Sequence, residues 1–312
     1  MTKKTMKFGR SSKWKFYFFV FVLLLPALLT VFAFYLTPAL LTVTMSFTDM
    51  DYRLKWDFIG FGNFQRMMQD RILSRVIVVT GIYVTATLFF FNVGFALVLA
   101  IVTTSVSDRV GTFFRSLWLL PRFTPPIVYG IIWMWILDPT KDGFLNNIRN
   151  LMGLRPQDWI FNYPIPVIVV INGIIGASFG MLIFTAAIRS ISREIIWAAR
   201  VDGAGWFQTI RYITIPQIRW PLLFVTAYQT LSLLTSYEYI LIVTQGGPNY
   251  ATTVWSLYAY NMCFGGYYAP YRFGYGSALA LVLVVLGAVA SVVYWRLFKF
   301  RQMMAEPLIE VV

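Results

Sequence analysis

Arg122 places a guanidinium roughly 15 Å along an apolar helix, at 1.5 Å per residue, within the run 113–137. A cation at that depth in a membrane span costs on the order of 2.5–3.5 kcal/mol, so a compensating partner is expected. A guanidinium binds a carboxylate through two parallel hydrogen bonds, and carboxylate recognition is therefore the chemistry that this residue suits. Two partners are open: Glu238, which would form an internal ion pair, or a carboxylate on a bound molecule.

The rest of the chain lacks most groups that catalyse reactions. It contains no His and a single cysteine, Cys263, which excludes disulfides within the chain, Cys/His metal sites and His general bases. No GxxxxGK[ST] segment occurs, so ATP would have to bind a partner chain. The 13 acidic residues fall almost entirely in predicted loops, which disfavours a catalytic carboxylate pair. We therefore expect a non-catalytic protein with no cofactor or metal of its own, and Cys263 as a packing residue.

The apolar residues fall into runs that predict membrane spans. The chain is 58% hydrophobic and 12% charged, whereas soluble proteins carry roughly a quarter charged residues. A helix needs about 20 residues to cross the bilayer core, and the alternation typical of a membrane barrel is absent. We predict an all-α polytopic membrane protein with six transmembrane helices. The spans are approximately residues 16–47, 76–104, 113–137, 164–188, 221–244 and 275–297. Kinks or broken ends are expected at Pro26, Pro38, Pro121, Pro125 and Pro126.

The basic residues predict the orientation of these spans. Most of the 26 Lys and Arg residues fall in the segments that are cytoplasmic if the N-terminus is inside, which favours both termini in the cytoplasm. The net charge of +13 is then a topology signal. Nucleic-acid binding is disfavoured because these residues form no patch with stacking aromatics. The expected organisation is a basic tail over 1–15, a transmembrane domain over 16–300 and a cytoplasmic tail over 301–312.

An amphipathic stretch interrupts the apolar runs at residues 195–222, which read IIWAARVDGAGWFQTIRYITIPQIRWPL. It lies in the predicted cytoplasmic loop 189–220. The pattern predicts a short helix from Trp197 to Trp206 and a second piece from Phe207 to Ile215, stopped by Pro216. The small-residue face of the first helix comprises Ala198, Val201, Ala204 and Gly205. This face suits insertion into a partner's groove, while the aromatic residues equally suit an interfacial helix on lipid.

This stretch resembles the cytoplasmic loop of bacterial ABC importer permeases, which reads E-A-A, three residues, G, nine residues, then I-x-L-P. Here Ala198 and Ala199 stand three residues before Gly203, and nine further residues lead to the segment ITIP. The segments LWLLPRFTPP, WILDPTKDGFLNN and TQGGP resemble the maltose-type, carbohydrate-uptake branch. The resemblance covers roughly residues 16–300. Trp197 replaces the motif's Glu and Ser192 replaces a usual Pro, which implies a different or weaker coupling contact.

The resemblance implies a set of partners. The chain would be half of a pore in the bacterial inner membrane, paired with a second homologous permease subunit. Two ATPase subunits would bind ATP and Mg²⁺, and a periplasmic or extracellular solute-binding protein would deliver an oligosaccharide. The residues implied to contact the ATPase are Trp197, Ala198, Ala199, Asp202, Gly203 and Ala204.

The resemblance also implies a substrate-binding set. Asn172 and Gly176 fall at sugar-lining positions with the family's residue types, and Gln229 and Ser236 fall there with changed types. For Asn172, Gln229 and Ser236, a hydrogen bond between helices is an equal alternative. Arg122 stands where the family has Tyr, so we expect an acidic saccharide such as a uronate oligosaccharide. A secondary transporter or channel is the alternative function, although only Glu238 offers a carboxylate for proton or sodium coupling.

Overall fold

The computed structural model describes residues 10–265 and 271–298 of the chain. This part is helical and contains no strand, only an isolated bridge between Thr48 and Phe58. The elements, with π-helical segments marked η, are α1 (Arg10–Val31), η1 (Phe32–Leu36), α2 (Thr37–Ser46), α3 (Gly62–Gln69), α4 (Arg71–Ala86), η2 (Thr87–Phe95), α5 (Ala96–Ser105), α6 (Asp108–Phe123), α7 (Pro126–Ile136), α8 (Phe144–Leu151), α9 (Trp159–Asn162), α10 (Pro164–Arg189), α11 (Arg193–Val201), α12 (Trp206–Thr209), η3 (Ile210–Thr214), α13 (Ile215–Gln217), α14 (Arg219–Thr235), α15 (Glu238–Val243), α16 (Trp255–Phe264) and α17 (Phe273–Leu297). The all-α prediction is confirmed. The predicted tail 301–312 and most of the tail 1–15 lie outside the described residues.

Four helices of the described part are long and apolar enough to cross a membrane. They are Trp14–Ser46, Arg71–Ser105, Pro164–Arg189 and Phe273–Leu297. The first joins α1, η1 and α2, and the second joins α4, η2 and α5. These helices overlap the first, second, fourth and sixth predicted spans, and a multi-pass membrane protein follows from their number and composition.

The third predicted span, 113–137, is broken into α6 and α7. The helix α6 ends at Phe123, Thr124 is extended with φ −75° and ψ 130°, and α7 begins at Pro126. A residue before proline is driven out of the helical region, and proline supplies no N–H to continue the helix. The break predicted at Pro125 and Pro126 is present, whereas Pro121 lies inside α6.

The fifth predicted span, 221–244, is broken as well. The helix α14 ends at Thr235, Ser236 is extended with φ −74° and ψ 124°, and α15 begins at Glu238. The Ser256 hydroxyl donates a 2.9 Å hydrogen bond to the Ser236 carbonyl, which the break leaves without a helical partner. Neither proline nor glycine lies at this break, so hydropathy alone predicted a continuous span. The count of six spans stays a prediction.

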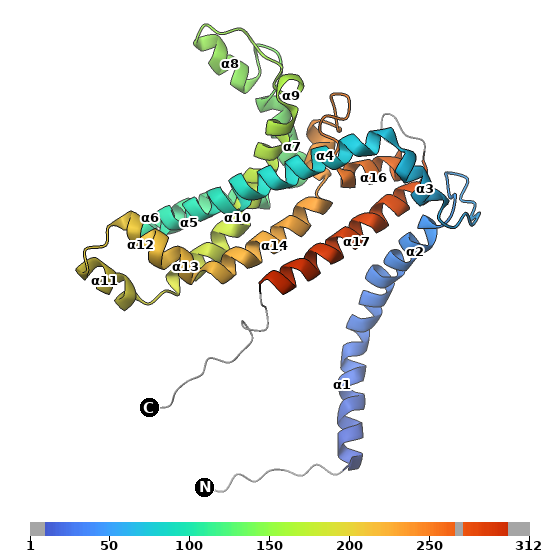
Figure 1. Cartoon of the computed structure of the whole chain (residues 1–312), viewed down its shortest axis with the longest axis horizontal. Coiled ribbons are helices and arrows are strands. Elements are labelled where there is room, and N and C mark those ends of the chain that lie inside the picture. Colours follow the sequence, from blue (N-terminus) through green and yellow to red (C-terminus); the bar gives the residue numbers. More distant parts are fainter. Residues whose placement is uncertain (1–9, 266–270, 299–312) are drawn as a thin grey trace.

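The helix α10 is the centre of the bundle. In its most apolar window 72% of the residues are buried, against 28% or less in the other three long helices. It packs against η2, α5, α6 and α14 (Figure 1). Three glycines at helical spacing allow the close approach to η2, because a Cβ on Gly173 would overlap the Phe91 ring and one on Gly176 would overlap the Asn92 side chain. Gly180 likewise faces the backbone of η2.

The first long helix leaves the bundle. Figure 1 shows α1 leaning away, whereas the far end of α2 joins α17. None of the most apolar window of Trp14–Ser46 is buried within the chain. Pro26 lies inside α1, and the π-helical turn η1 directly precedes α2, which carries Pro38 in its first turn; both features bend helices. The N-terminal helix thus packs on the bundle only through α2, and its most apolar window stays unburied in the described part of this chain.

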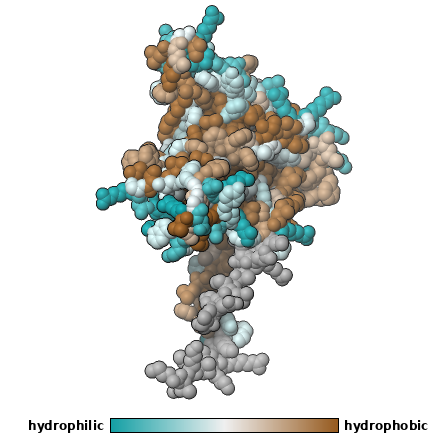
Figure 2. Space-filling model, turned by 60° about the vertical axis from the view of Figure 1, so that its left-hand side comes forward, coloured by the Kyte–Doolittle hydropathy of each residue, from teal (hydrophilic) through white to brown (hydrophobic). Residues whose placement is uncertain are grey.

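Apolar side chains are exposed over much of the rest of the bundle. Figure 2 shows broad brown areas on the face turned toward the viewer. Large exposed hydrophobic residues occur on η2, α7 and α17 as well as on α1. A soluble monomer rarely exposes contiguous apolar areas of this kind, whereas contact with lipid or another membrane subunit accounts for them.

Candidate functional site

Asn172 on α10 joins three segments of the chain. Its Nδ2 donates hydrogen bonds to Tyr83 Oη on α4, at 2.6 Å, and to Ser236 Oγ at the break after α14, at 2.7 Å. Asn172 is 7% exposed and Tyr83 is fully buried. Buried polar groups need partners, and Asn172 finds its partners within the chain. Of the two roles open for Asn172 and Ser236, the hydrogen bond between helices is the one formed here.

Gln229 on α14 makes a second contact with α10. Its Nε2 donates a 2.8 Å hydrogen bond to the carbonyl of Gly176, and its side chain is 4% exposed. The side chain of Asn92 covers Gly176 from the opposite element, η2. Both polar atoms of Asn92 are buried without a hydrogen-bond partner in the described part of the chain. Gln229 and Gly176 therefore fasten α14 to the bundle centre.

Arg122 lies in the last turn of α6 and is exposed. Its Nη1 donates a long 3.5 Å hydrogen bond to Ser178 Oγ, and its guanidinium lies over the Phe179 ring at 5.6 Å. The ring of Phe179 stacks in turn on Tyr228, with centroids 4.6 Å apart. The ion pairs of the described residues do not include one between Arg122 and Glu238. The guanidinium thus has neutral neighbours and several N–H donors available.

The five predicted substrate-binding residues all meet at α10. Arg122 contacts it through Ser178 and Phe179. Gln229 contacts it through Gly176, and Ser236 contacts it through Asn172. Of the four that carry side chains, Arg122 is exposed, Ser236 is half-buried, and Asn172 and Gln229 are buried. Tyr83 was not predicted as part of this group. In the sequence it is only a residue with a hydroxyl group within an apolar run, and nothing there indicates that it bonds to Asn172.

The predicted coupling residues form an exposed helix and turn. The helix α11 runs from Arg193 to Val201, so it begins earlier and ends earlier than the predicted helix from Trp197 to Trp206. The second piece also differs, because α12, η3 and α13 continue through Pro216 to Gln217. No residue of α11 is buried.

Gly203 explains where α11 ends. Its φ of +81° is left-handed, a conformation that glycine adopts without strain. The Gly203 N–H donates to the Arg200 carbonyl at 3.1 Å and the Ala204 N–H to the Ala199 carbonyl at 2.9 Å. This pair of bonds is the Schellman arrangement that closes a helix. The turn therefore comprises Asp202, the C-cap residue of α11, together with Gly203 and Ala204.

Trp197 and Val201 dominate the outward face of α11. Trp197 is 56% exposed and Val201 is 87% exposed. Ala198 is also exposed, whereas Ala199 and Ala204 are half-buried. An exposed face with two large apolar side chains and a small one between them suits contact with another protein surface.

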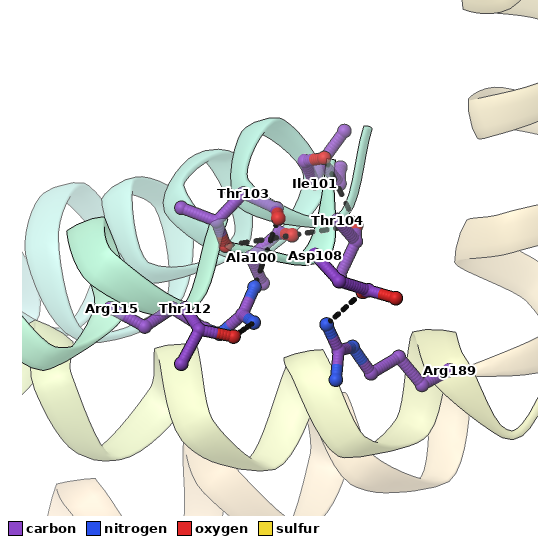
Figure 3. Close-up of polar contacts among 8 residues, drawn as sticks. All are labelled: Ala100, Ile101, Thr103, Thr104, Asp108, Thr112, Arg115 and Arg189. Carbon is purple, nitrogen blue, oxygen red and sulfur yellow. Dashed lines mark hydrogen bonds and ion pairs between the residues drawn. The ribbon is translucent and has the colours of Figure 1, made fainter. Parts of the chain in front are cut away.

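The bundle end near α11 is held by arginines. Arg189 Nη2 donates to Asp108 Oδ1 at 2.7 Å and so joins α10 to α6 (Figure 3). Arg115 is buried and donates to the Thr103 carbonyl and Thr112 Oγ1, both at 2.9 Å, which ties α6 to α5. Sequence reasoning used these arginines only as orientation signals, although their place at span ends was visible.

These features define a class: an all-α, multi-pass membrane subunit with an exposed helix between two of its membrane segments. Residues 92–300 match the family described as binding-protein-dependent transport system inner membrane components. The match spans more than half of the chain, and the chain belongs to this family. It is therefore an inner membrane component of a transport system that uses a binding protein.

Individual relatives agree with this assignment. The chain is 27% identical over 291 residues to the trehalose/maltose transport system permease protein MalF of Thermococcus litoralis, covering 90% of this chain and 94% of that protein. A solved bacterial alginate ABC transporter, in complex with an alginate pentasaccharide-bound periplasmic protein, shares the fold with a TM-score of 0.78 and 23% identity, covering 90% of this chain and 93% of that one. A second structure, of a bacterial ABC transporter involved in the import of the acidic polysaccharide alginate, gives a TM-score of 0.76 and 24% identity, covering 90% and 96%.

Proposed function

We propose that this chain forms half of the membrane path of an ABC importer for oligosaccharides. It acts with a second homologous permease subunit, two ATPase subunits that bind ATP and Mg²⁺, and an external solute-binding protein. The helix from Trp14 to Ser46 supports a second membrane subunit, because none of its most apolar window is buried in the described part of this chain. The chain itself is non-catalytic, and both termini lie in the cytoplasm, as the distribution of Lys and Arg indicates.

The exposed helix α11 is the observation that carries this proposal. It presents Trp197, Ala198 and Val201 outward, and the turn at Gly203 fixes its end. We expect a partner ATPase to bind this face, with Ala199, Asp202 and Ala204 supporting the contact. Movement of the ATPase would then shift α11 as a rigid lever and rock the bundle between inward-facing and outward-facing states. Trp197 would supply an apolar contact where the family motif has a carboxylate.

The environment of Arg122 supports an acidic cargo. The residue is exposed, its contacts are Ser178 Oγ and the Phe179 ring, and no ion pair with Glu238 forms within the described residues. A guanidinium with no acid of its own can bind a carboxylate of the cargo through two hydrogen bonds. A transporter of the same fold is described as importing the acidic polysaccharide alginate. We therefore favour an oligosaccharide that carries carboxylates, such as a uronate oligosaccharide.

The other four predicted residues would shape the wall of the path. Asn172 and Gln229 use their side chains to hold Ser236 and α14 against α10. Gly176 allows α10 to lie close to η2, because a side chain at this position would overlap Asn92. In this proposal Arg122 touches the cargo, while Asn172, Gly176, Gln229 and Ser236 set the shape of the surface past which it moves.

Substitution of Arg122 by glutamine tests the cargo. Uptake of a uronate trisaccharide and of a neutral trisaccharide is measured in proteoliposomes that hold the complete complex and its binding protein. Arg122→Gln should slow uronate uptake by about 10-fold to 100-fold, as expected for the loss of a charge-assisted contact. The matched control is Arg109→Gln, an exposed arginine in the first turn of the same helix. Unchanged uronate uptake, or a complex that no longer assembles, would favour a structural role for Arg122.

A further inference from the structure

A cavity of about 410 Å³ lies between α11 and the adjoining end of the helix bundle. Its walls are the ends of α5, α6 and α10, the helix α11, and the segment that follows α11 as far as Thr214. This volume falls within the range of about 300–1,000 Å³ that is usual for small-molecule sites. The space is therefore large enough for a compact ligand and borders the helix assigned to coupling.

The cavity carries an excess of positive charge. Arg189, Arg193 and Arg200 line it, and Asp108 is the one acidic residue among its described lining residues. Asp108 already accepts a hydrogen bond from Arg189 through Oδ1 (Figure 3). Arg193 and Arg200 form no side-chain hydrogen bond or ion pair that balances their charge in the described residues. Two guanidinium groups that line a cavity whose one carboxylate among the described residues is already paired with Arg189 define a place for an anion.

Neutral polar and apolar side chains complete the lining. The Trp206 indole is held at the rim, where its Nε1 donates a 3.4 Å hydrogen bond to Ser105 Oγ. Thr104 and Thr209 also line the space, with their hydroxyls donating to backbone carbonyls of the chain itself. The guanidinium groups are therefore the donors available to phosphate oxygens, which such groups commonly bind. Ile101 and Ile188 add apolar surface that could cover the carbon chain attached to such a group.

The cavity and the proposed ATPase contact use different residues of α11, although Ala204, which follows the helix, belongs to both. Arg193, Ile196 and Arg200 lie three and four residues apart, which places them on one face of the helix, and all three line the cavity. Trp197 and Val201 do not line it and are exposed. A ligand in the cavity and a partner on the outward face can therefore contact α11 at the same time.

We propose that this cavity binds a phosphate-bearing ligand, either the headgroup of an anionic phospholipid or a soluble phosphate compound. The phosphate oxygens accept hydrogen bonds from Arg193 and Arg200 on α11 while the ligand also contacts the α10 end at Arg189. Such a ligand joins the coupling helix to the bundle. Binding of this ligand depends only on the basic cavity. It is therefore independent of whether the cargo is an acidic saccharide.

Direct binding to the complete complex tests this site. The complex is prepared in nanodiscs of phosphatidylcholine and in nanodiscs that also contain phosphatidylglycerol, and retained phosphatidylglycerol is counted by native mass spectrometry. Inorganic phosphate and pyrophosphate are titrated into the phosphatidylcholine sample by calorimetry, with the nucleotide sites of the ATPases blocked. Saturable binding of phosphatidylglycerol alone assigns the ligand to a lipid, and saturable binding of the soluble anions assigns it to a soluble compound.

Variants decide whether this cavity is responsible. Arg193→Gln and Arg200→Gln should each weaken the binding by about tenfold or more, as expected for loss of a charge-assisted hydrogen bond. Arg219→Gln is the control, because Arg219 is exposed at the start of α14 and does not line the cavity. Size-exclusion chromatography checks that each variant complex assembles. Absence of saturable binding in both arms, or an equal loss in the Arg219→Gln complex, would overturn the proposal.

Discussion

Asn172 on α10 donates a 2.7 Å hydrogen bond to Ser236 Oγ, at the point where the run from α14 to α15 is broken. The carbonyl of Ser236 accepts a second bond from Ser256 Oγ. A break in a membrane helix leaves backbone groups unpaired, and neighbouring polar side chains can satisfy them. Two side chains from other helices thus hold this break in place, and α15 leaves the line of α14 without exposing the Ser236 carbonyl to lipid.

Replacement of Asn172 by alanine should destabilise the protein. Tyr83 Oη and Ser236 Oγ would lose their shared donor, at a cost in unfolding free energy of about 1–3 kcal/mol. Thermal unfolding of the detergent-solubilised complex measures this loss as a lower Tm. Asn147→Ala, on an exposed position of α8, is the control. An unchanged Tm together with lost uptake would instead assign Asn172 to direct contact with the cargo.

Gly176→Ala should separate α10 from η2. The added Cβ would overlap the Asn92 side chain, which is itself buried and cannot move into open space. Overpacking of this kind costs about 1–3 kcal/mol, and we expect a lower Tm and a reduced yield of assembled complex. Gly81→Ala is the matched control, because a Cβ there meets no atom within 4 Å. If both variants behave like the wild type, the close approach of α10 and η2 does not depend on this glycine.

Gly203→Ala should impair coupling without any steric clash. A Cβ on Gly203 meets nothing within 4 Å, so the effect comes only from the left-handed backbone, at φ +81°. An L-residue in this conformation costs about 1–2 kcal/mol, which loosens the turn that ends α11. We expect fewer molecules to be transported for each ATP hydrolysed. The ratio of uptake to ATP hydrolysis in proteoliposomes measures this loss.

The control for this change is Gly205→Ala, two residues along the same turn. Gly205 has φ −69°, which any residue adopts, so this variant should couple normally. Equal ratios for Gly203→Ala and the wild type would show that the left-handed turn is dispensable for coupling.

Much of the fold could be predicted from the sequence because membrane spans depend on local composition. The long apolar runs and the break at Pro125 follow from residue types alone. The break at Ser236 could not be predicted, because no helix-breaking residue lies there and the conformation depends on hydrogen bonds from Asn172 and Ser256. The sequence predicted α1 as part of a membrane span. That none of its most apolar window is buried could not be predicted, because burial depends on how the helices pack.

In the candidate site, too, features set by local sequence could be predicted, whereas those that depend on contacts between distant residues could not. Gly203 was singled out because the spacing of its motif is local, but the helix was predicted to continue to Trp206, and the turn that ends α11 at Val201 is seen only in the structure. The role of Asn172 stayed open because its partners, Tyr83 and Ser236, are distant in the sequence. The basic cavity was missed because Arg189 and Arg200 are brought to one space by the fold, whereas in the sequence they appeared only as charges at span ends.

We expect a separate ATPase to bind α11 on its outward face, and cysteine cross-linking within the complete complex tests this contact. In a Cys263→Ala background, Val201→Cys places a thiol on the exposed face and Ile196→Cys places one on the cavity face. Each complex is treated with a thiol-to-amine cross-linker, and the ATPase is followed by electrophoresis. We predict efficient cross-linking of Val201→Cys to the ATPase and little for Ile196→Cys. Cross-linking from Ile196→Cys alone, or from neither position in an assembled complex, would show that the ATPase does not bind the outward face of α11.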